Sequence, residues 1–114
     1  MRRFASVIAA LALAACTTVP DRFEAAPETG PYEVGEWKYS ARVLPLDAGT
    51  YDVYVLTLPK IGWGGSAFDQ QARFVEAARM SLAETCADPR PEIAASASAS
   101  PMFSPVAMIV RLRC

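Results

Sequence analysis

A short apolar segment that ends at a cysteine constrains this chain more than any other feature. Arg2 and Arg3 are followed by an apolar run that begins at Phe4 and ends at Cys16. A basic start, an apolar stretch and small residues before a cleavage point are typical of an export signal. We therefore expect residues 1–15 to be removed, which leaves 99 of the 114 residues, enough for one small domain.

A membrane-spanning helix and a buried core helix are the alternatives for this segment. The twelve residues from Phe4 to Ala15 would span only about 18 Å as a helix, whereas a bilayer core is about 30 Å thick. Thr17 and Thr18 follow at once, and residues 7–15 are apolar all round rather than amphipathic. The segment therefore fits a cleaved leader, exported by ordinary secretion because the surroundings of the two arginines match a twin-arginine signal poorly.

The four residues Leu13-Ala14-Ala15-Cys16 resemble the lipobox of bacterial lipoproteins. The resemblance implies that Cys16 is lipidated and becomes the first residue of the mature chain. Thr17, which stands where some lipoproteins have Asp, resembles the sorting signal for the outer membrane in enteric bacteria. The expected location is therefore the outer membrane, facing the periplasm, with the membrane itself as a partner through the lipid.

Charge is unevenly distributed in the expected mature chain. Without Arg2 and Arg3 it holds nine basic side chains against twelve acidic ones, and the excess of acid lies in residues 16–36. That segment also carries three prolines and few large apolar groups, so we expect a flexible acidic tether, followed by a domain at 37–114. The domain is nearly neutral, which gives it no electrostatic reason to bind nucleic acid or anionic lipid.

Cys86 and Cys114 are the two cysteines that remain after Cys16. An even pair in an oxidising compartment favours a disulfide, which would stabilise the fold by roughly 3.5 kcal/mol through loop closure. Zinc would need further ligands, and the chain has no histidine. We therefore expect a disulfide between these residues and no bound metal.

One helix is expected at residues 66–86, with Ser66 and Asp69 forming its amino-terminal cap. Apolar residues recur there at helical spacing, which predicts that one stripe of the helix faces the core. Its members are Phe68, Ala72, Val75, Leu82 and Cys86.

Strands are expected on both sides of this helix. Residues 37–46 and 50–59 flank the turn Asp47-Ala48-Gly49, and residues 106–114 alternate with Cys114 on the apolar side. For Cys114 to meet Cys86, the last strand must run in the direction of the helix, so residues 93–98 form either a returning strand or an Ala/Ser loop. The prediction is an α+β fold, an antiparallel sheet with one helix on one face in the order ββαββ, joined by a disulfide.

Catalytic chemistry has little support in the sequence. The absence of histidine removes the commonest general base, and Glu76 and Glu84 would lie about 12 Å apart along the helix. The segment from Gly62 to Ser66 is either a weak anion site at the helix start or a permissive turn. We expect no enzyme activity and no cofactor.

An apolar patch is the best candidate for partner binding. Tyr54, Leu56 and Leu58 lie on the strand face that a single helix cannot cover, and Trp63 follows in the next loop. If these side chains are exposed, they suit an envelope protein partner or self-association. The alternative is that the tether or residues 87–102 cover them.

The strand Tyr51-Asp52-Val53-Tyr54-Val55 and the helical pair Ala77-Ala78 are loosely similar to segments of small proteobacterial envelope lipoproteins. The resulting hypothesis is a lipid-anchored lipoprotein with a non-enzymatic protein-binding or adaptor domain. One alternative is an inhibitor of a cell-wall hydrolase, with a protruding loop around Trp63. A second alternative is a small periplasmic enzyme, which would need a deep pocket.

Overall fold

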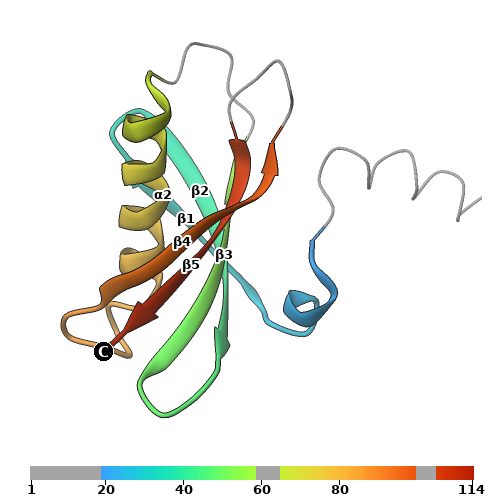
Figure 1. The fold of residues 1–114 in the computed structure, drawn as a ribbon, viewed down its shortest axis with the longest axis vertical. Helices are drawn as coiled ribbons and strands as arrows, with labels where there is room; N and C mark the ends of the chain where they lie inside the picture. The colour runs from blue at the N-terminus through green and yellow to red at the C-terminus, as the bar shows by residue number, and fades with distance from the viewer. Residues whose placement is uncertain (1–18, 59–64, 100–104) are drawn as a thin grey trace, which may run out of the picture.

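The fold is given by a computed structural model that describes residues 19–58, 65–99 and 105–114 (Figure 1). The elements are η1 Asp21–Phe23, β1 Glu28–Val34, β2 Trp37–Pro45, β3 Thr50–Thr57, α2 Ala67–Ser81, β4 Arg90–Ala99 and β5 Pro105–Arg113. The predicted antiparallel sheet, single helix and disulfide are confirmed. The predicted order ββαββ is wrong, because an additional strand, β1, precedes it.

The five strands lie in the order β1-β2-β3-β5-β4, and each pairs antiparallel with its neighbours. Figure 1 shows α2 on one side of the sheet and η1 on the opposite side. We call these sides the helix face and the strap face. Strand alternation assigns Val53 and its partner Val110 to the helix face, and Asp52 and its partner Arg111 to the strap face.

Residues 28–34 form an edge strand in the segment that was expected to be a flexible tether. Tyr32 and Val34 pack against the core, and the strand pairs with β2 with an irregularity between Thr29 and Tyr32. Gly30 and Pro31 lie at that irregularity, where a strand tolerates residues that would disrupt a central one. The domain therefore begins before residue 37, and the tether prediction is wrong from Val19 onward.

The turn between β2 and β3 is where the sequence placed it. Leu46 and Thr50 close it, because the amide of Leu46 donates to the carbonyl of Thr50 at 2.9 Å. Gly49 has φ of 82°, a left-handed conformation that other residues adopt at a cost. The glycine at this position therefore fixes the hairpin.

The helix α2 begins as predicted, since the Ser66 hydroxyl accepts a hydrogen bond from the amide of Asp69 at 3.1 Å. It ends at Ser81, five residues before the predicted end, and Cys86 lies in the turns that follow. The helix covers the core cluster of the helix face, whose other members come from β2, β3, β5 and the turns that follow α2.

The predicted apolar stripe of the helix is confirmed in part. Leu82 and Cys86 are buried in the core and Val75 packs against it, whereas Phe68 is 81% exposed and Ala72 is exposed as well.

The apolar helical side chains buried against the sheet are Phe74, Ala77 and Ala78, which the predicted stripe did not include. The two alanines let the helix backbone approach the strands closely, and the ring of Phe74 meets the ring of Tyr39 edge-on at 5.2 Å. The helix is therefore rotated so that Phe74 and the two alanines, rather than Phe68, face the strands.

The returning segment is a strand and not a loop, because β4 spans residues 90–99 and pairs with β5. Figure 1 shows β5 running in the same direction as α2, as the cysteine positions required. The Cα atoms of Cys86 and Cys114 are 5.5 Å apart, and their sulfurs are bonded.

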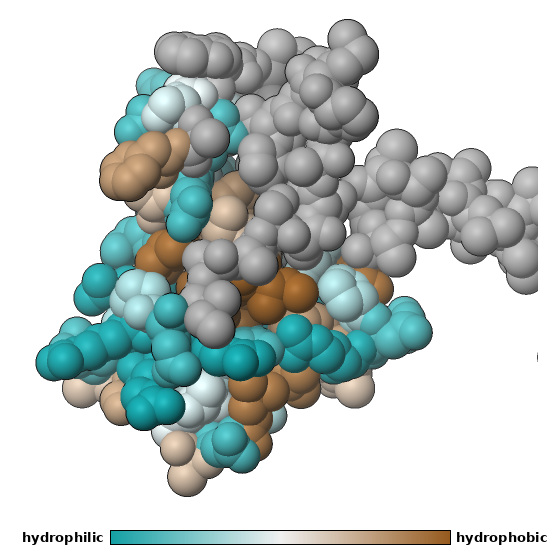
Figure 2. Space-filling view, viewed as in Figure 1, coloured by the Kyte–Doolittle hydropathy of each residue, from teal (hydrophilic) through white to brown (hydrophobic). Residues whose placement is uncertain are grey.

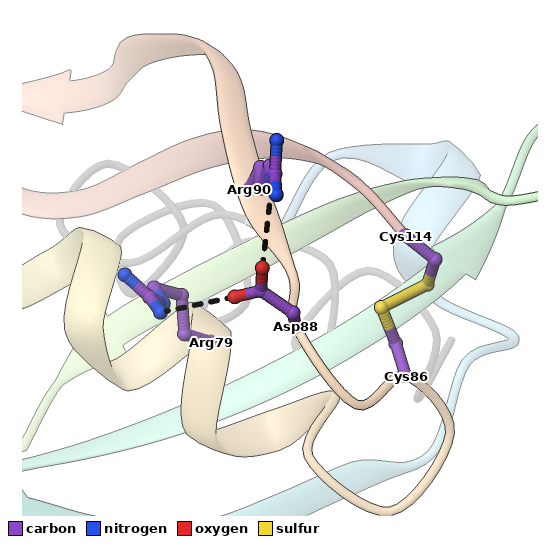
Figure 3. Close-up of a disulfide and its surroundings, with 5 residues drawn as sticks. All are labelled: Arg79, Cys86, Asp88, Arg90 and Cys114. Carbon is purple, nitrogen blue, oxygen red and sulfur yellow. Dashed lines mark hydrogen bonds and ion pairs between the residues drawn. A yellow bond between two sulfur atoms is a disulfide. The ribbon is translucent and has the colours of Figure 1, made fainter.

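Ion pairs reinforce the corner beside the disulfide (Figure 3). Asp88 lies between Arg79 of α2 and Arg90 of β4, with N–O distances of 3.8 and 3.2 Å. All three side chains are largely exposed, so these pairs add little stability. The disulfide is the principal link between the helix end and the sheet here.

A candidate interaction surface on the strap face

The strap face is covered by the segment that runs from Val19 to Pro27, which we call the strap. Its aromatic residue, Phe23, is completely buried, and the ring lies 5.7 Å from that of Tyr54 on β3. Together with Ala107 they form a second core cluster, against which Val19 packs. Phe23 is thus the main apolar anchor of the strap, with smaller contributions from Val19 and the buried Ala26.

A buried carboxylate provides the second attachment of the strap. Asp52 lies in the middle of the sheet with a side chain that is 1% exposed. Arg22 of the strap donates to its Oδ2 at 2.7 Å, while Arg111 of β5 donates to both of its oxygens at 2.8 and 3.1 Å. Two guanidinium groups therefore compensate one buried negative charge, as burial of a charge requires.

The balance of burial and pairing decides the charge state of Asp52. Burial alone would raise the pKa of its carboxyl, but the hydrogen bonds and positive charges of Arg111 and Arg22 outweigh that effect. The pKa of Asp52 is consequently held below its usual value. The carboxylate is ionised at neutral pH and acts as a structural acceptor.

A third attachment comes from β2. The guanidinium of Arg42 donates to the carbonyl oxygen of Ala26 at 2.8 Å. The guanidinium carbon of Arg22 also lies 4.5 Å from the centre of the Phe23 ring, a cation–π contact. The strap is therefore attached along its length by an aromatic ring, an ion pair and a hydrogen bond from the Arg42 side chain to a strap carbonyl.

The predicted partner residues have different outcomes. Tyr54 is only 2% exposed because the strap, which is part of the expected tether, covers it. The alternative of a covered side chain is therefore confirmed at Tyr54, and an exposed binding role there is wrong. Leu56 and Leu58 are half-buried, and Leu56 packs against the second cluster. Trp63 and Cys16 lie outside the described residues, so their predicted roles remain predictions.

Two functional features of this face were missed at the sequence level. Phe23 is a large aromatic residue inside a polar, proline-containing segment, and Asp52 is a charge inside an apolar strand. Each residue differs in polarity from its neighbours in the sequence. That difference was the available signal that the segment around Phe23 packs against the strand that contains Asp52.

A shallow hollow lies beside the strap face, next to the edge strand. It has a volume of about 220 Å³, and its lining consists of Glu28, Thr29, Gly30, Pro31, Ser40 and Leu58. Glu28 is the only carboxylate in that lining, so the hollow holds no pair of carboxylates for acid–base catalysis. The side chain of Leu58 and the hydroxyl groups of Thr29 and Ser40 line the hollow and are available for contact with a partner.

Hydrophilic side chains gather in a band on the molecular surface. Figure 2 shows this band crossing the lower part of the view, over β4 and β5 and toward η1. Its charges are largely paired, since Arg111 and Arg22 bind Asp52 and Arg113 binds Glu92 at 3.1 Å. The band is therefore polar without a strong net charge.

Across residues 19–58, 65–99 and 105–114, no three His, Cys, Asp or Glu side chains come together as a metal site needs. Within the same ranges, no helix is long and apolar enough to cross a bilayer. Comparisons of the chain with protein families, curated proteins and solved structures found no match.

Proposed function

We propose that this protein is a lipoprotein of the bacterial outer membrane, anchored through Cys16, whose domain binds a protein partner in the periplasm without catalysing a reaction. The observation that carries the proposal is the disulfide between Cys86 and Cys114. Disulfides persist in exported proteins and are rare in the cytosol. The disulfide therefore agrees with the compartment to which the leader ending at Cys16 would deliver the chain.

The partner surface that we propose surrounds the end of β3 and the start of α2. Leu58 is half-buried beside the shallow hollow, and Phe68 is the most exposed large apolar side chain among the described residues. Both flank the segment 59–64, which contains Trp63. Aromatic residues at accessible positions are frequent anchors of protein interfaces.

The anchor is tested by growing an enteric host that expresses the full chain with a labelled fatty acid. The native protein is expected to incorporate the label and to lose residues 1–15, and Cys16→Ser should do neither. Thr17→Ser is the matched control and should be labelled like the native protein. Label in Cys16→Ser equal to that in the native protein would contradict the lipid anchor.

The outer-membrane location is tested by density-gradient separation of the two membranes in the same host. The native protein should follow the outer membrane, and Thr17→Asp should move to the inner one. Identical positions for both proteins would contradict the proposed sorting.

Partner binding is tested with a photoreactive residue placed at Phe68 in living cells. We expect one protein adduct of defined mass, which disappears when Leu58→Ser is added. The same residue placed at Leu46, an exposed position at the β2–β3 turn, serves as the control. Equal adducts from both positions would contradict a specific surface at Phe68.

A further inference from the structure

The strap determines how far the domain can move from its anchor. Val19, the first described residue, packs against the cluster of Phe23, Tyr54 and Ala107. Only three peptide steps separate it from Cys16, which span at most about 11 Å when extended. The tether expected from the sequence, about 20 residues with a root-mean-square span of roughly 25 Å, is therefore largely absent.

The amino-terminal end of the domain, which leads to the anchor, lies on one face of the sheet. Because Val19 packs on the strap face, a lipid on Cys16 must lie within the reach of three residues from that face. The helix face lies on the other side of the sheet (Figure 1). A domain anchored in this way cannot turn its helix face to the bilayer without detaching the strap.

We propose that the strap face is the lipid-facing surface of this domain and that its occupant is the phospholipid headgroup layer of the membrane that holds the anchor. The inference rests on the proposed lipidation of Cys16 and adds the orientation of the domain to it. Phe68 on α2 then remains accessible to a protein partner, and Leu58 lies at the margin between that partner and the lipid.

Electrostatics are not the cause of this orientation. The strap-face arginines Arg22 and Arg111 share the carboxylate of Asp52, and Arg113 pairs with Glu92. The excess positive charge, which includes that of Arg42, is offset by the exposed carboxylates Asp21 and Glu24 of the strap. A face with balanced charges has no marked preference for anionic lipid. The orientation should therefore persist in bilayers of phosphatidylcholine alone and at high salt.

The frequency of contact between the strap face and lipid depends on the number of residues that connect Cys16 to the folded domain. If the strap detached, the connection would lengthen from three residues to about twelve, up to the start of β1 at Glu28. Effective concentration falls roughly with the 3/2 power of linker length, so contact with lipid should drop about eightfold.

The test places a photoreactive benzoylphenylalanine at Leu56, on the strap face, or at Met80, on α2. Each full-length lipoprotein is reconstituted in phosphatidylcholine vesicles, irradiated and analysed for lipid adducts by mass spectrometry. We expect more lipid adduct at Leu56 than at Met80, and the adduct at Leu56 should fall on the order of eightfold when the strap is detached.

Phe23→Ala should bring the two positions toward equal yields, because it removes the aromatic anchor of the strap. Leu46→Ala, at an exposed apolar position, is the matched control that leaves the difference intact. Detachment is verified by faster tryptic cleavage after Arg22. The mass of each sample also reports acylation of Cys16. Equal adducts from the two positions in an acylated protein would overturn the orientation alone, whereas an unmodified Cys16 would refute the proposed anchor.

A second reconstitution uses membranes extracted from cells and tests whether a protein partner, rather than lipid, contacts the strap face. Lipid adducts at Leu56 are again the expected product. Adducts at Leu56 to protein alone would assign the strap face to a protein partner and overturn the inference.

Discussion

At the scale of single residues, Asp52 has the greatest influence on how this fold is completed. It is a buried acid in an apolar strand, and its partners, Arg22 and Arg111, lie 30 and 59 residues away in the sequence. A buried charge without partners would be strongly destabilising. The fold is therefore stable only when the strap brings Arg22 to Asp52 and the register of β5 brings Arg111 there.

Asp52→Asn should lower the free energy of unfolding by about 2 kcal/mol, since a neutral amide cannot compensate two guanidinium groups at a buried site. The partly exposed arginines keep this cost below that of a fully buried pair. Urea denaturation followed by fluorescence measures the change. Asp88→Asn, at an exposed ion pair, should cost less than about 0.5 kcal/mol, and equal costs would contradict the role given to Asp52.

The pH dependence of stability has a predictable sign. Because the pKa of Asp52 is lower in the folded than in the unfolded protein, its contribution is fully present above the ordinary value of about 3.9. It is lost as the pH falls from there through the lowered folded-state pKa. Chemical denaturation between pH 2 and pH 7 should show this loss as about one proton taken up on unfolding, which Asp52→Asn should remove. An identical acid profile in the variant would exclude Asp52 as its source.

At the scale of elements, the strap behaves as a part of the core. Phe23→Ala should destabilise the domain by about 3 kcal/mol because it empties a completely buried site. Phe68→Ala, at an exposed helical site, should change stability by less than about 0.5 kcal/mol. The two variants are compared by urea denaturation. A small effect at Phe23 would show that the strap does not contribute to the folded domain.

The disulfide joins the end of α2 to the end of β5. Replacing both cysteines, Cys86→Ser with Cys114→Ser, should lower the free energy of unfolding by about 3.5 kcal/mol through the lost restriction of the unfolded chain. Adding reductant should destabilise the native protein by a similar amount and leave the double variant unchanged. Reductant sensitivity of the double variant would contradict this explanation.

The elements were predictable from the sequence where local chemistry determines them. Ser66 starts the helix, Gly49 closes a hairpin, and the alternation in residues 106–114 gives β5. Two elements were not predictable in this way. The first is β1, whose proline and glycine are typical of a tether and are tolerated because β1 is an edge strand. The second is the rotation of α2, which turns Ala77 and Ala78 to the sheet because these small side chains let the helix backbone lie close to the strands.

At the scale of the whole molecule, the candidate site could be predicted only in part. The open strand face was identified, but its cover depends on pairing Phe23 with Tyr54 and Arg22 with Asp52, which local patterns do not reveal. The consequence for function is substantial. With the lipidated Cys16 that we propose, the strap replaces a long flexible tether, and the proposed result is a domain held close to its membrane with the strap face toward the lipid.

The proposed function and orientation both require a mature chain that begins at an acylated Cys16 and carries an oxidised cysteine pair. Intact-mass spectrometry of the protein, extracted from membranes without reductant, measures both features at once. We expect a mass that lacks residues 1–15, includes the acyl groups, and increases by two hydrogens on reduction. A mass equal to that of the complete, unmodified 114-residue chain would contradict both proposals.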